Sequence, residues 1–125
     1  MKKPQLSATV ITLYPELFPG PLSASVTGRA LEKKIWSLET IDLRVYGKGK
    51  HKQVDDKPIS GGPGMVLRPD VLDQALLQAS RSVTDTKKLI VCMSPKGIPF
   101  TQNTAKNLLQ YNEIIIVCGR FEGID

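Results

Sequence analysis

The sequence predicts an α/β fold in which a mostly parallel sheet is flanked by helices. Two short, continuous apolar runs, Leu89–Met93 and Ile114–Cys118, are typical of strands buried on both faces of a parallel sheet. A third run, Leu6–Leu13, is apolar and β-branched, and it ends at Tyr14-Pro15, where proline removes a backbone donor. These runs predict three strands, the last two of which are neighbours joined by a helix.

The segment between the first run and the last two carries three further elements. Ser25–Ile35 has apolar residues at helical spacing and predicts a short helix. Leu38–Tyr46 alternates apolar and polar residues, which predicts a half-buried strand of edge character. Pro69 can occupy the first position of a further helix. Its apolar stripe is formed by Leu72, Ala75, Leu76 and Ala79.

The helix that joins the last two strands is expected to begin after Thr101. Threonine is a good N-cap residue because its hydroxyl accepts a hydrogen bond from the first helical turn. Ala105, Leu108 and Leu109 would then share one helical face.

Length and composition indicate one globular domain. The chain has 125 residues, of which 41% are apolar and 23% charged, and no apolar run approaches the roughly 20 residues of a membrane span. A cytoplasmic location without membrane contact is the expectation. Cys92 and Cys118 form neither a Cys-x-x-Cys pair nor a cluster with histidine, so neither disulfides nor a metal site are expected. Both cysteines are predicted to be small core residues.

Positive charge gathers in one stretch of the chain. The formal net charge is +5, and Arg44, Lys48, Lys50, Lys52 and Lys57 lie close together. From Tyr46 to Gly64 no hydrophobic period survives, and a loop of this length is usually functional or disordered. Such a loop favours a polyanionic partner, although an ordinary solvated loop explains the charge equally well. His51 is the only histidine and is expected to be solvated.

A glycine-rich segment, Ser60–Met65, follows the basic stretch. It can be a tight connection, since glycine and proline supply unusual backbone angles. Alternatively, glycines without Cβ atoms allow a flat base to lie against the backbone. Beside a basic loop, the second interpretation indicates a nucleotide.

The loops after the last two predicted strands are also rich in turn residues. They are Ser94–Gly97 and Gly119–Gly123, and ligands of open parallel sheets bind beyond the carboxyl ends of the strands. Gly-x-Gly-x-x-Gly after a strand, the P-loop, Gly-x-Ser-x-Gly and His-Glu-x-x-His are all missing, which argues against dinucleotide binding, acyl transfer and metalloprotease chemistry. The alternative for the second loop is a plain strand-to-helix turn with a surface pair of Arg120 and Glu122.

Taken in order, these motifs resemble the TrmD family of tRNA guanine-N1 methyltransferases, of the knotted SPOUT class. The resemblance covers essentially the whole chain. It is carried by Thr12–Phe18, Val26–Ala30, His51–Pro58, Gly61–Met65, Ser94–Gly97 and Cys118–Asp125. Ser60, Gln53 and Phe121 depart from the family pattern of glycine, threonine and tyrosine at these positions.

The resemblance implies transfer of a methyl group from S-adenosylmethionine to N1 of guanosine 37 in tRNA, the base just 3′ of the anticodon. It also implies a homodimer with the active site between subunits. The cofactor pocket would be lined by Met93, Ser94, Pro95, Gly97, Cys118, Gly119, Arg120, Phe121, Glu122 and Gly123. The target guanine and the tRNA strand would meet Gly61, Gly62, Pro63, Gly64, Met65, His51, Lys52 and Asp55.

Residues 1–125 are expected to form the N-terminal, cofactor-binding SPOUT domain, truncated at its C-terminal end, with an incomplete trefoil knot and without the tRNA-binding domain. The resemblance places the catalytic base and a guanine-orienting arginine beyond Asp125. Asp55 and Asp56 are expected to be structural or to orient tRNA, and the chain alone should be inactive and bind the cofactor weakly. Two alternatives stay open: a knotted methyltransferase for another RNA site, and a non-catalytic RNA-binding module.

Overall fold

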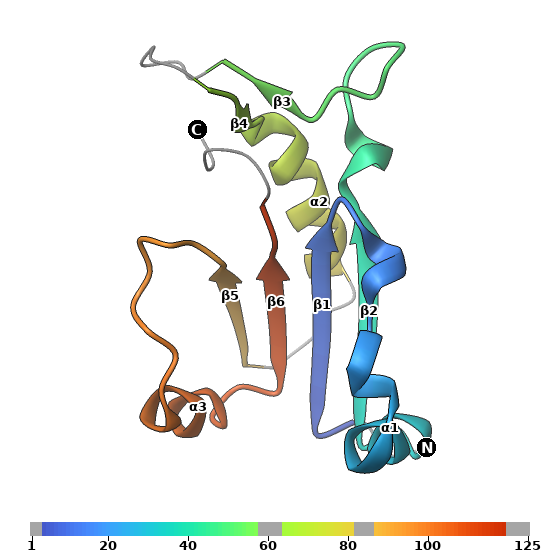
Figure 1. Ribbon diagram of the computed structural model, residues 1–125, viewed down its shortest axis with the longest axis vertical. Helices are drawn as coiled ribbons and strands as arrows, with labels where there is room; N and C mark the ends of the chain where they lie inside the picture. Colours follow the sequence, from blue (N-terminus) through green and yellow to red (C-terminus); the bar gives the residue numbers. More distant parts are fainter. Residues whose placement is uncertain (1–3, 58–63, 82–86, 120–125) are drawn as a thin grey trace.

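Four strands of the computed structural model run in the same direction and form one sheet (Figure 1). They are β1 (Leu6–Thr12), β2 (Trp36–Asp42), β5 (Lys88–Cys92) and β6 (Glu113–Val117). Their order is β2-β1-β6-β5, and each neighbouring pair is parallel. The structure describes residues 4–57, 64–81 and 87–119. The predicted α/β class is confirmed.

The register brings the carboxyl ends of these strands to one edge of the sheet. Ile11 of β1 lies opposite Val117 of β6, and Cys92 of β5 lies on the other side of Val117. Thr12 lies opposite Asp42, the last residue of β2. The prediction that the last two apolar runs are adjacent strands is confirmed, with each strand one residue earlier than expected.

In the described residues three α-helices accompany the sheet: α1 (Ser25–Glu32), α2 (Pro69–Arg81) and α3 (Gln102–Leu108). On α2 the predicted stripe is confirmed, because Leu72, Ala75 and Ala79 are buried. The Thr101 cap of α3 is confirmed too. Its hydroxyl accepts from the Thr104 amide at 3.3 Å, and the Thr101 amide donates to the Thr104 hydroxyl at 3.4 Å.

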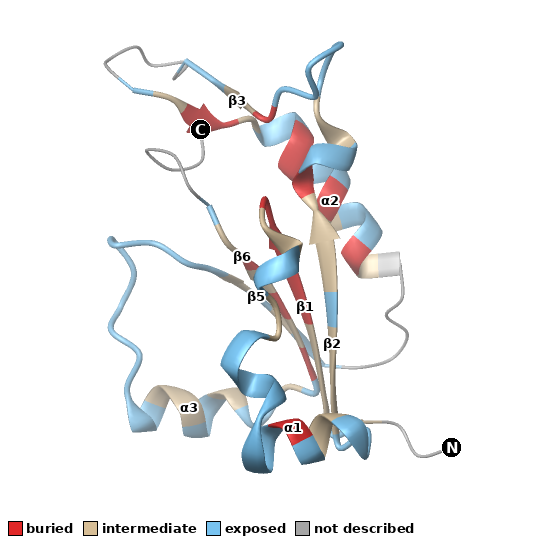
Figure 2. Ribbon diagram, turned by 45° about the vertical axis from the view of Figure 1, so that its right-hand side comes forward, coloured by how far each residue is buried: buried red, intermediate tan, exposed pale blue. Residues whose placement is uncertain are grey.

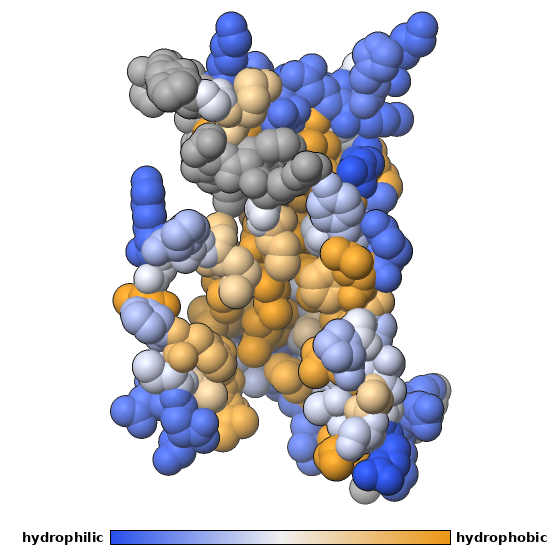
Figure 3. Space-filling model, viewed as in Figure 1, coloured by the Kyte–Doolittle hydropathy of each residue, from blue (hydrophilic) through white to orange (hydrophobic). Residues whose placement is uncertain are grey.

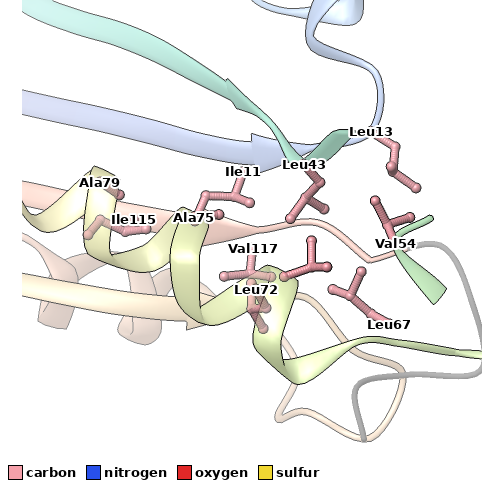
Figure 4. Close-up of a cluster of buried hydrophobic side chains, with 11 residues drawn as sticks. Ile11, Leu13, Leu43, Val54, Leu67, Leu72, Ala75, Ala79, Ile115 and Val117 are labelled. Atoms are coloured by element: carbon pink, nitrogen blue, oxygen red, sulfur yellow. The ribbon is translucent and has the colours of Figure 1, made fainter. Parts of the chain in front are cut away.

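A small antiparallel ribbon stands beyond the carboxyl edge of the sheet (Figure 1). It pairs β3 (Asp55–Asp56) with β4 (Val66–Leu67). Val54 and Leu67 join the ribbon to the main hydrophobic core, where they pack in one cluster with Ile11 and Val117 of the sheet and Ala75 of α2 (Figure 4). Sheet, helix α2 and ribbon therefore share one core.

Burial differs sharply between the parts of this structure (Figure 2). Buried residues concentrate in β1, β6, α2 and the base of the ribbon, whereas the long connection from β5 to α3 is exposed throughout. On the face of the sheet turned away from α2, apolar side chains are visible at the surface (Figure 3). The register assigns Leu89, Val91, Ile114 and Ile116 to that face.

Several predicted details are wrong, each for a local reason. The strand expected over Leu38–Tyr46 ends at Asp42, whose carboxylate accepts the Arg44 amide at 2.9 Å and caps the 3₁₀ helix Leu43–Tyr46. The loop expected from Tyr46 to Gly64 contains β3 and a bridge between Lys48 and Gln53.

The prediction that β5 is buried on both faces is also wrong. Its residues are exposed or half-buried in alternation, because β5 lies at the end of the described sheet with β6 as its neighbour. Cys92 is exposed and not a core residue, and Cys118 is only partly buried. Leu109 is 83% exposed, since α3 ends one residue before it.

Candidate functional site

The ends of β5 and β6 bring the two predicted cofactor loops together. The Met93 amide donates to the Val117 carbonyl at 3.0 Å, and the Cys118 amide donates to the Ile11 carbonyl at 2.9 Å. Met93 thus begins one loop directly beside Val117, two residues before Gly119. The backbone of three neighbouring strands fixes where both loops start.

The first loop turns tightly within four residues. The Ser94 hydroxyl accepts from the Lys96 amide at 3.1 Å, and the Ser94 carbonyl accepts from the Gly97 amide at 3.1 Å. A Cβ on Gly97 would lie 3.3 Å from that carbonyl oxygen, closer than is usual. Met93, Ser94, Pro95 and Gly97 are all exposed. The turn therefore presents its backbone and the Met93 side chain to solvent.

The start of the second loop is open on one side. A Cβ added to Gly119 would meet no described atom within 4 Å. Burial raises the pKa of the preceding Cys118 thiol, and the nearby Cys92 adds to this shift, so Cys118 is a neutral thiol at physiological pH. Arg120, Phe121, Glu122 and Gly123, which were predicted to complete this wall, lie outside the described residues.

The predicted tRNA-contacting residues lie on a turn and on the ribbon. Lys48 and Gln53 exchange backbone hydrogen bonds of 2.8 and 2.9 Å, and His51 and Lys52 are exposed in the turn between them. Lys52 has a positive φ of 52°. Asp55, in β3, is partly buried. The turn that contains His51 and Lys52 and the ribbon that contains Asp55 thus lie beyond the same edge of the sheet as the starts of the two predicted cofactor loops (Figure 1).

Part of the predicted base-binding segment can also be placed. Gly64 is exposed and has a φ of +88°, a backbone conformation that favours glycine. Met65 is partly buried and immediately precedes β4. Gly61, Gly62 and Pro63 lie outside the described residues.

Two arginines near this edge were not singled out as site residues from the sequence. Arg44 donates to the Leu13 carbonyl and lies with its guanidinium 5.4 Å from the centre of the Tyr14 ring, which ties β1 to the 3₁₀ helix after β2. Arg68, between β4 and α2, makes ion pairs with Asp56 and Asp70. For Arg68, the sequence indicated only the neighbouring Asp70, on the other side of Pro69. It gave no sign that Asp56 would be a second partner.

A cavity of about 500 Å³ lies elsewhere, along the outer side of β2. Its lining comes from β2, the 3₁₀ helix that follows and α2, and includes Glu39, Asp42, Tyr46 and Gln78. None of the predicted site residues contributes to this cavity. The carboxyl edge of the sheet is therefore the better candidate for the functional site.

Within residues 4–57, 64–81 and 87–119, no three His, Cys, Asp or Glu side chains gather as they would around a metal ion. Among the helices of that part of the chain, none has the length and apolar character needed to cross a membrane.

Comparison with known proteins agrees with the motifs. The family model described as tRNA (Guanine-1)-methyltransferase TrmD matches residues 6–125. A tRNA (guanine-N(1)-)-methyltransferase of Jannaschia sp. (strain CCS1) is 53% identical over 120 residues, which are 94% of this chain and 49% of the relative. The protein of that name from Ehrlichia canis (strain Jake) is 48% identical over 120 residues, 96% of this chain and 50% of the relative.

A third protein with this name, from Zymomonas mobilis subsp. mobilis, is 48% identical over 125 residues, 100% of this chain and 49% of the relative. The chain thus spans about half the length of the curated relatives it matches. The family model covers nearly all of the chain, and the parallel sheet fits a domain of this kind. The chain therefore belongs to the TrmD family of tRNA (guanine-1)-methyltransferases.

Proposed function

We propose that the protein carrying this chain transfers a methyl group from S-adenosylmethionine to N1 of guanosine 37 in tRNA. The observation that carries the proposal is the meeting of Met93–Gly97 with Cys118–Gly119 at the carboxyl edge of a parallel sheet, in a member of the TrmD family.

The residues at this edge fit the proposed cofactor. Adenosine is a flat group with polar edges, and the exposed turn at Ser94–Gly97 offers backbone carbonyl groups as hydrogen-bond acceptors. Met93 is 60% exposed and offers an apolar contact, while the space beside Gly119 holds no described atom. When bound, S-adenosylmethionine supplies a methyl group activated by its positively charged sulfur. We assign its binding to the ten residues predicted for the pocket, from Met93 to Gly123.

The turn around His51 and the ribbon fit the proposed RNA substrate. Lys50, His51 and Lys52 are exposed and can approach phosphates without losing a buried partner. Gly64 leaves the backbone before β4 uncovered, which favours contact with a base. We assign tRNA binding to these segments, with Gly61–Met65 against the guanine and with Asp55 and Lys52 toward the strand.

Methylation at N1 requires that the proton on N1 leave as the methyl group arrives, and a carboxylate beside the guanine is the expected acceptor. Asp56 does not suit this role. One of its oxygens accepts the Lys57 amide at 2.8 Å, and the other lies 3.6 Å from Arg68. We therefore propose that the base and the guanine-orienting arginine lie outside this chain, and that Asp55 and Asp56 shape the RNA-binding side.

The proposal includes the organisation of the whole protein. This chain would form its N-terminal, cofactor-binding SPOUT domain, and two copies would assemble with the active site between them. Ile98, Phe100 and Leu109 are 85%, 71% and 83% exposed, and they supply apolar surface of the kind that subunit contacts cover. Since the substrate is tRNA, the expected location is the cytoplasm.

The direct test is a methylation assay with a protein of the relatives' full length that contains this sequence. Purified protein is mixed with labelled S-adenosylmethionine and with tRNA transcripts that carry guanosine or adenosine at position 37. Label should enter only the guanosine transcript, and nuclease digestion should recover 1-methylguanosine. Light scattering on the same sample should give the mass of a dimer.

Other results would favour other functions. Label at a different position would assign the protein to another RNA site. Binding of tRNA without any methylation, and without stabilisation by S-adenosylmethionine in a thermal melt, would favour a non-catalytic RNA-binding module and overturn the proposal.

A further inference from the structure

Arg68 is the centre of a four-residue ion network beside the ribbon. Its guanidinium donates to both oxygens of Asp70, at 3.1 and 3.0 Å, and a third nitrogen lies 3.6 Å from an Asp56 oxygen. Lys48 extends the network, with its ammonium 3.9 Å from Asp70. One arginine therefore joins two carboxylates, and one of these carboxylates joins a lysine.

The four residues come from four different segments. Lys48 opens the basic turn, Asp56 ends β3, Arg68 follows β4, and Asp70 lies in the first turn of α2. The backbone adds one more connection, because the Arg68 amide donates to the Val54 carbonyl at 2.7 Å. The network thus holds the turn and both strands of the ribbon against one rigid helix.

These segments carry the described residues that the proposed function assigns to tRNA. His51 and Lys52 lie in the turn that the bridge from Lys48 to Gln53 closes. Asp55 is the neighbour of Asp56 in β3, and Gly64 and Met65 precede β4. Among the network residues, Asp56 was expected to be structural or to orient tRNA, whereas Lys48, Arg68 and Asp70 do not belong to the predicted set. Together the four residues connect each part of that set to the others.

We propose that Arg68 is a positioning residue for the tRNA substrate, which sets the basic turn and the β3–β4 ribbon relative to α2 through Asp56, Asp70 and Lys48. The inference rests on the proposed function.

The pairing of β3 with β4 is too short to fix the position of the ribbon relative to α2 by itself. Each strand of the ribbon has two residues, and a pair of that length has little stability of its own. Val54 and Leu67 anchor the base of the ribbon in the core, whereas the Asp56 carboxylate is exposed. Arg68 lies close to this carboxylate and to that of Asp70, because its planar fork reaches two carboxylates at once, as a lysine cannot.

The hydrogen bonds between Arg68 and Asp70 favour the charged form of both side chains. The hydrogen bond from Arg68 lowers the pKa of Asp70, and the bond to Asp70 raises the pKa of Arg68. Arg68 is 27% exposed and Asp70 47%, so water and salt screen the pairs. Because exposed ion pairs contribute little to the free energy of folding, their loss should alter the geometry of RNA binding more than global stability.

The test compares Arg68→Gln with Arg29→Gln in the full-length protein. Both variants lose one positive charge, and Arg29 is an exposed residue of α1, away from the network. We expect kcat/KM for tRNA to fall about tenfold or more in Arg68→Gln, since a substrate misplaced by about 1 Å can lose about a hundredfold. The dissociation constant for S-adenosylmethionine and the unfolding midpoint should match those of the parent, and Arg29→Gln should behave as the parent does.

Two further measurements separate positioning from simple attraction of RNA. Arg68→Lys keeps the charge but not the fork, so it should recover only a minor part of the lost kcat/KM. Amide exchange in Lys48–Asp56 should become faster in Arg68→Gln and not in Arg29→Gln, with no RNA present. In a double-mutant cycle, Asp56→Asn should add little to Arg68→Gln.

The inference is overturned if Arg68→Gln leaves both tRNA kcat/KM and amide exchange unchanged, or if Arg29→Gln causes an equal loss. It is also overturned if Arg68→Lys restores full activity, or if cofactor affinity and unfolding midpoint fall together with activity. A parent protein that does not methylate tRNA would instead refute the proposed function, and amide exchange would still report on the network.

Discussion

The backbone amide of Met93 and the carbonyl of Val117 lie 3.0 Å apart in a hydrogen bond that continues the pairing of β5 with β6. Each partner stands where its strand ends. Main-chain hydrogen bonds thereby fix Met93 and Cys118, where the two proposed cofactor loops begin. The cofactor site proposed above depends on this backbone geometry, so its residues can be tested with small changes of side-chain volume.

Gly119→Val should weaken cofactor binding and leave stability unchanged. A Cβ at this position meets no described atom within 4 Å, so no described part of the protein opposes a larger side chain. If the cofactor occupies that space, valine should raise its dissociation constant about tenfold or more, while Gly119→Ala should have a smaller effect. Calorimetric titration measures the affinity and a thermal melt the stability. Unchanged affinity in Gly119→Val would place the cofactor elsewhere.

Gly47→Ala should disturb the basic turn. A Cβ on Gly47 would lie 2.3 Å from the Lys52 carbonyl oxygen, so the turn must move. We expect a higher KM for tRNA with little change in cofactor affinity. Gly49→Asn is the matched control, since Gly49 has a φ of +75°, which asparagine tolerates, and no atom stands within 4 Å of its added Cβ. Equal effects of both variants would contradict this explanation.

Leu67→Ala should destabilise the whole fold, although Leu67 belongs to the ribbon. The side chain is 1% exposed and packs in the common core, and truncation of such a leucine costs about 2–5 kcal/mol. Leu77→Ala on α2 is the control, because Leu77 is 52% exposed and its loss should change the free energy of unfolding by about 0.5 kcal/mol or less. Urea titration measures both. A small effect at Leu67 would mean that the ribbon folds separately.

Alkaline pH should destabilise the protein through Cys118. Burial raises the pKa of this thiol above its ordinary value of 9.0, so the folded state retains a proton that the unfolded chain releases. The contribution of the protonated Cys118 thiol to the free energy of unfolding is fully present below pH 9. This contribution is lost as the pH rises through the raised pKa of the folded state. The free energy of unfolding should therefore decline above pH 9 less steeply in Cys118→Ala than in the parent. Cys92→Ala should lie between the two, because it removes the smaller cause of the raised pKa and leaves the burial of Cys118 in place.

Much of the fold could be predicted from local patterns. The helix after Pro69, the Thr101 cap and the adjacency of β5 and β6 each follow from residues that lie close together in the sequence. The end of β2 at Asp42 could not be predicted in this way, since Leu43 is apolar and fits the alternation of a strand. What ends the strand is the Asp42 carboxylate bound to the Arg44 amide, which competes with the strand conformation.

The candidate site was predictable where its residues follow strand ends, as Met93 and Cys118 do. The contributions of Arg44 and Arg68 were not, because each acts on a partner brought close by the fold. Arg44 reaches Leu13 and Arg68 reaches Asp56, and no short-range pattern links either pair. Cys92 was misplaced for a related reason, because an apolar run does not show whether its strand has one neighbour or two.

Ile11 contacts both the start of a proposed cofactor loop and the core that anchors the ribbon. Its carbonyl holds Cys118 at the start of one proposed cofactor loop, and its fully buried side chain packs in the cluster that anchors the ribbon. If the protein methylates tRNA as proposed, a genetic screen for altered methylation would recover substitutions at Ile11 alongside those at ligand-contacting residues, although Ile11 is closed to solvent. In an engineered or evolving lineage, this position would then offer a way to tune the proposed activity without altering any surface proposed to touch the RNA or the cofactor.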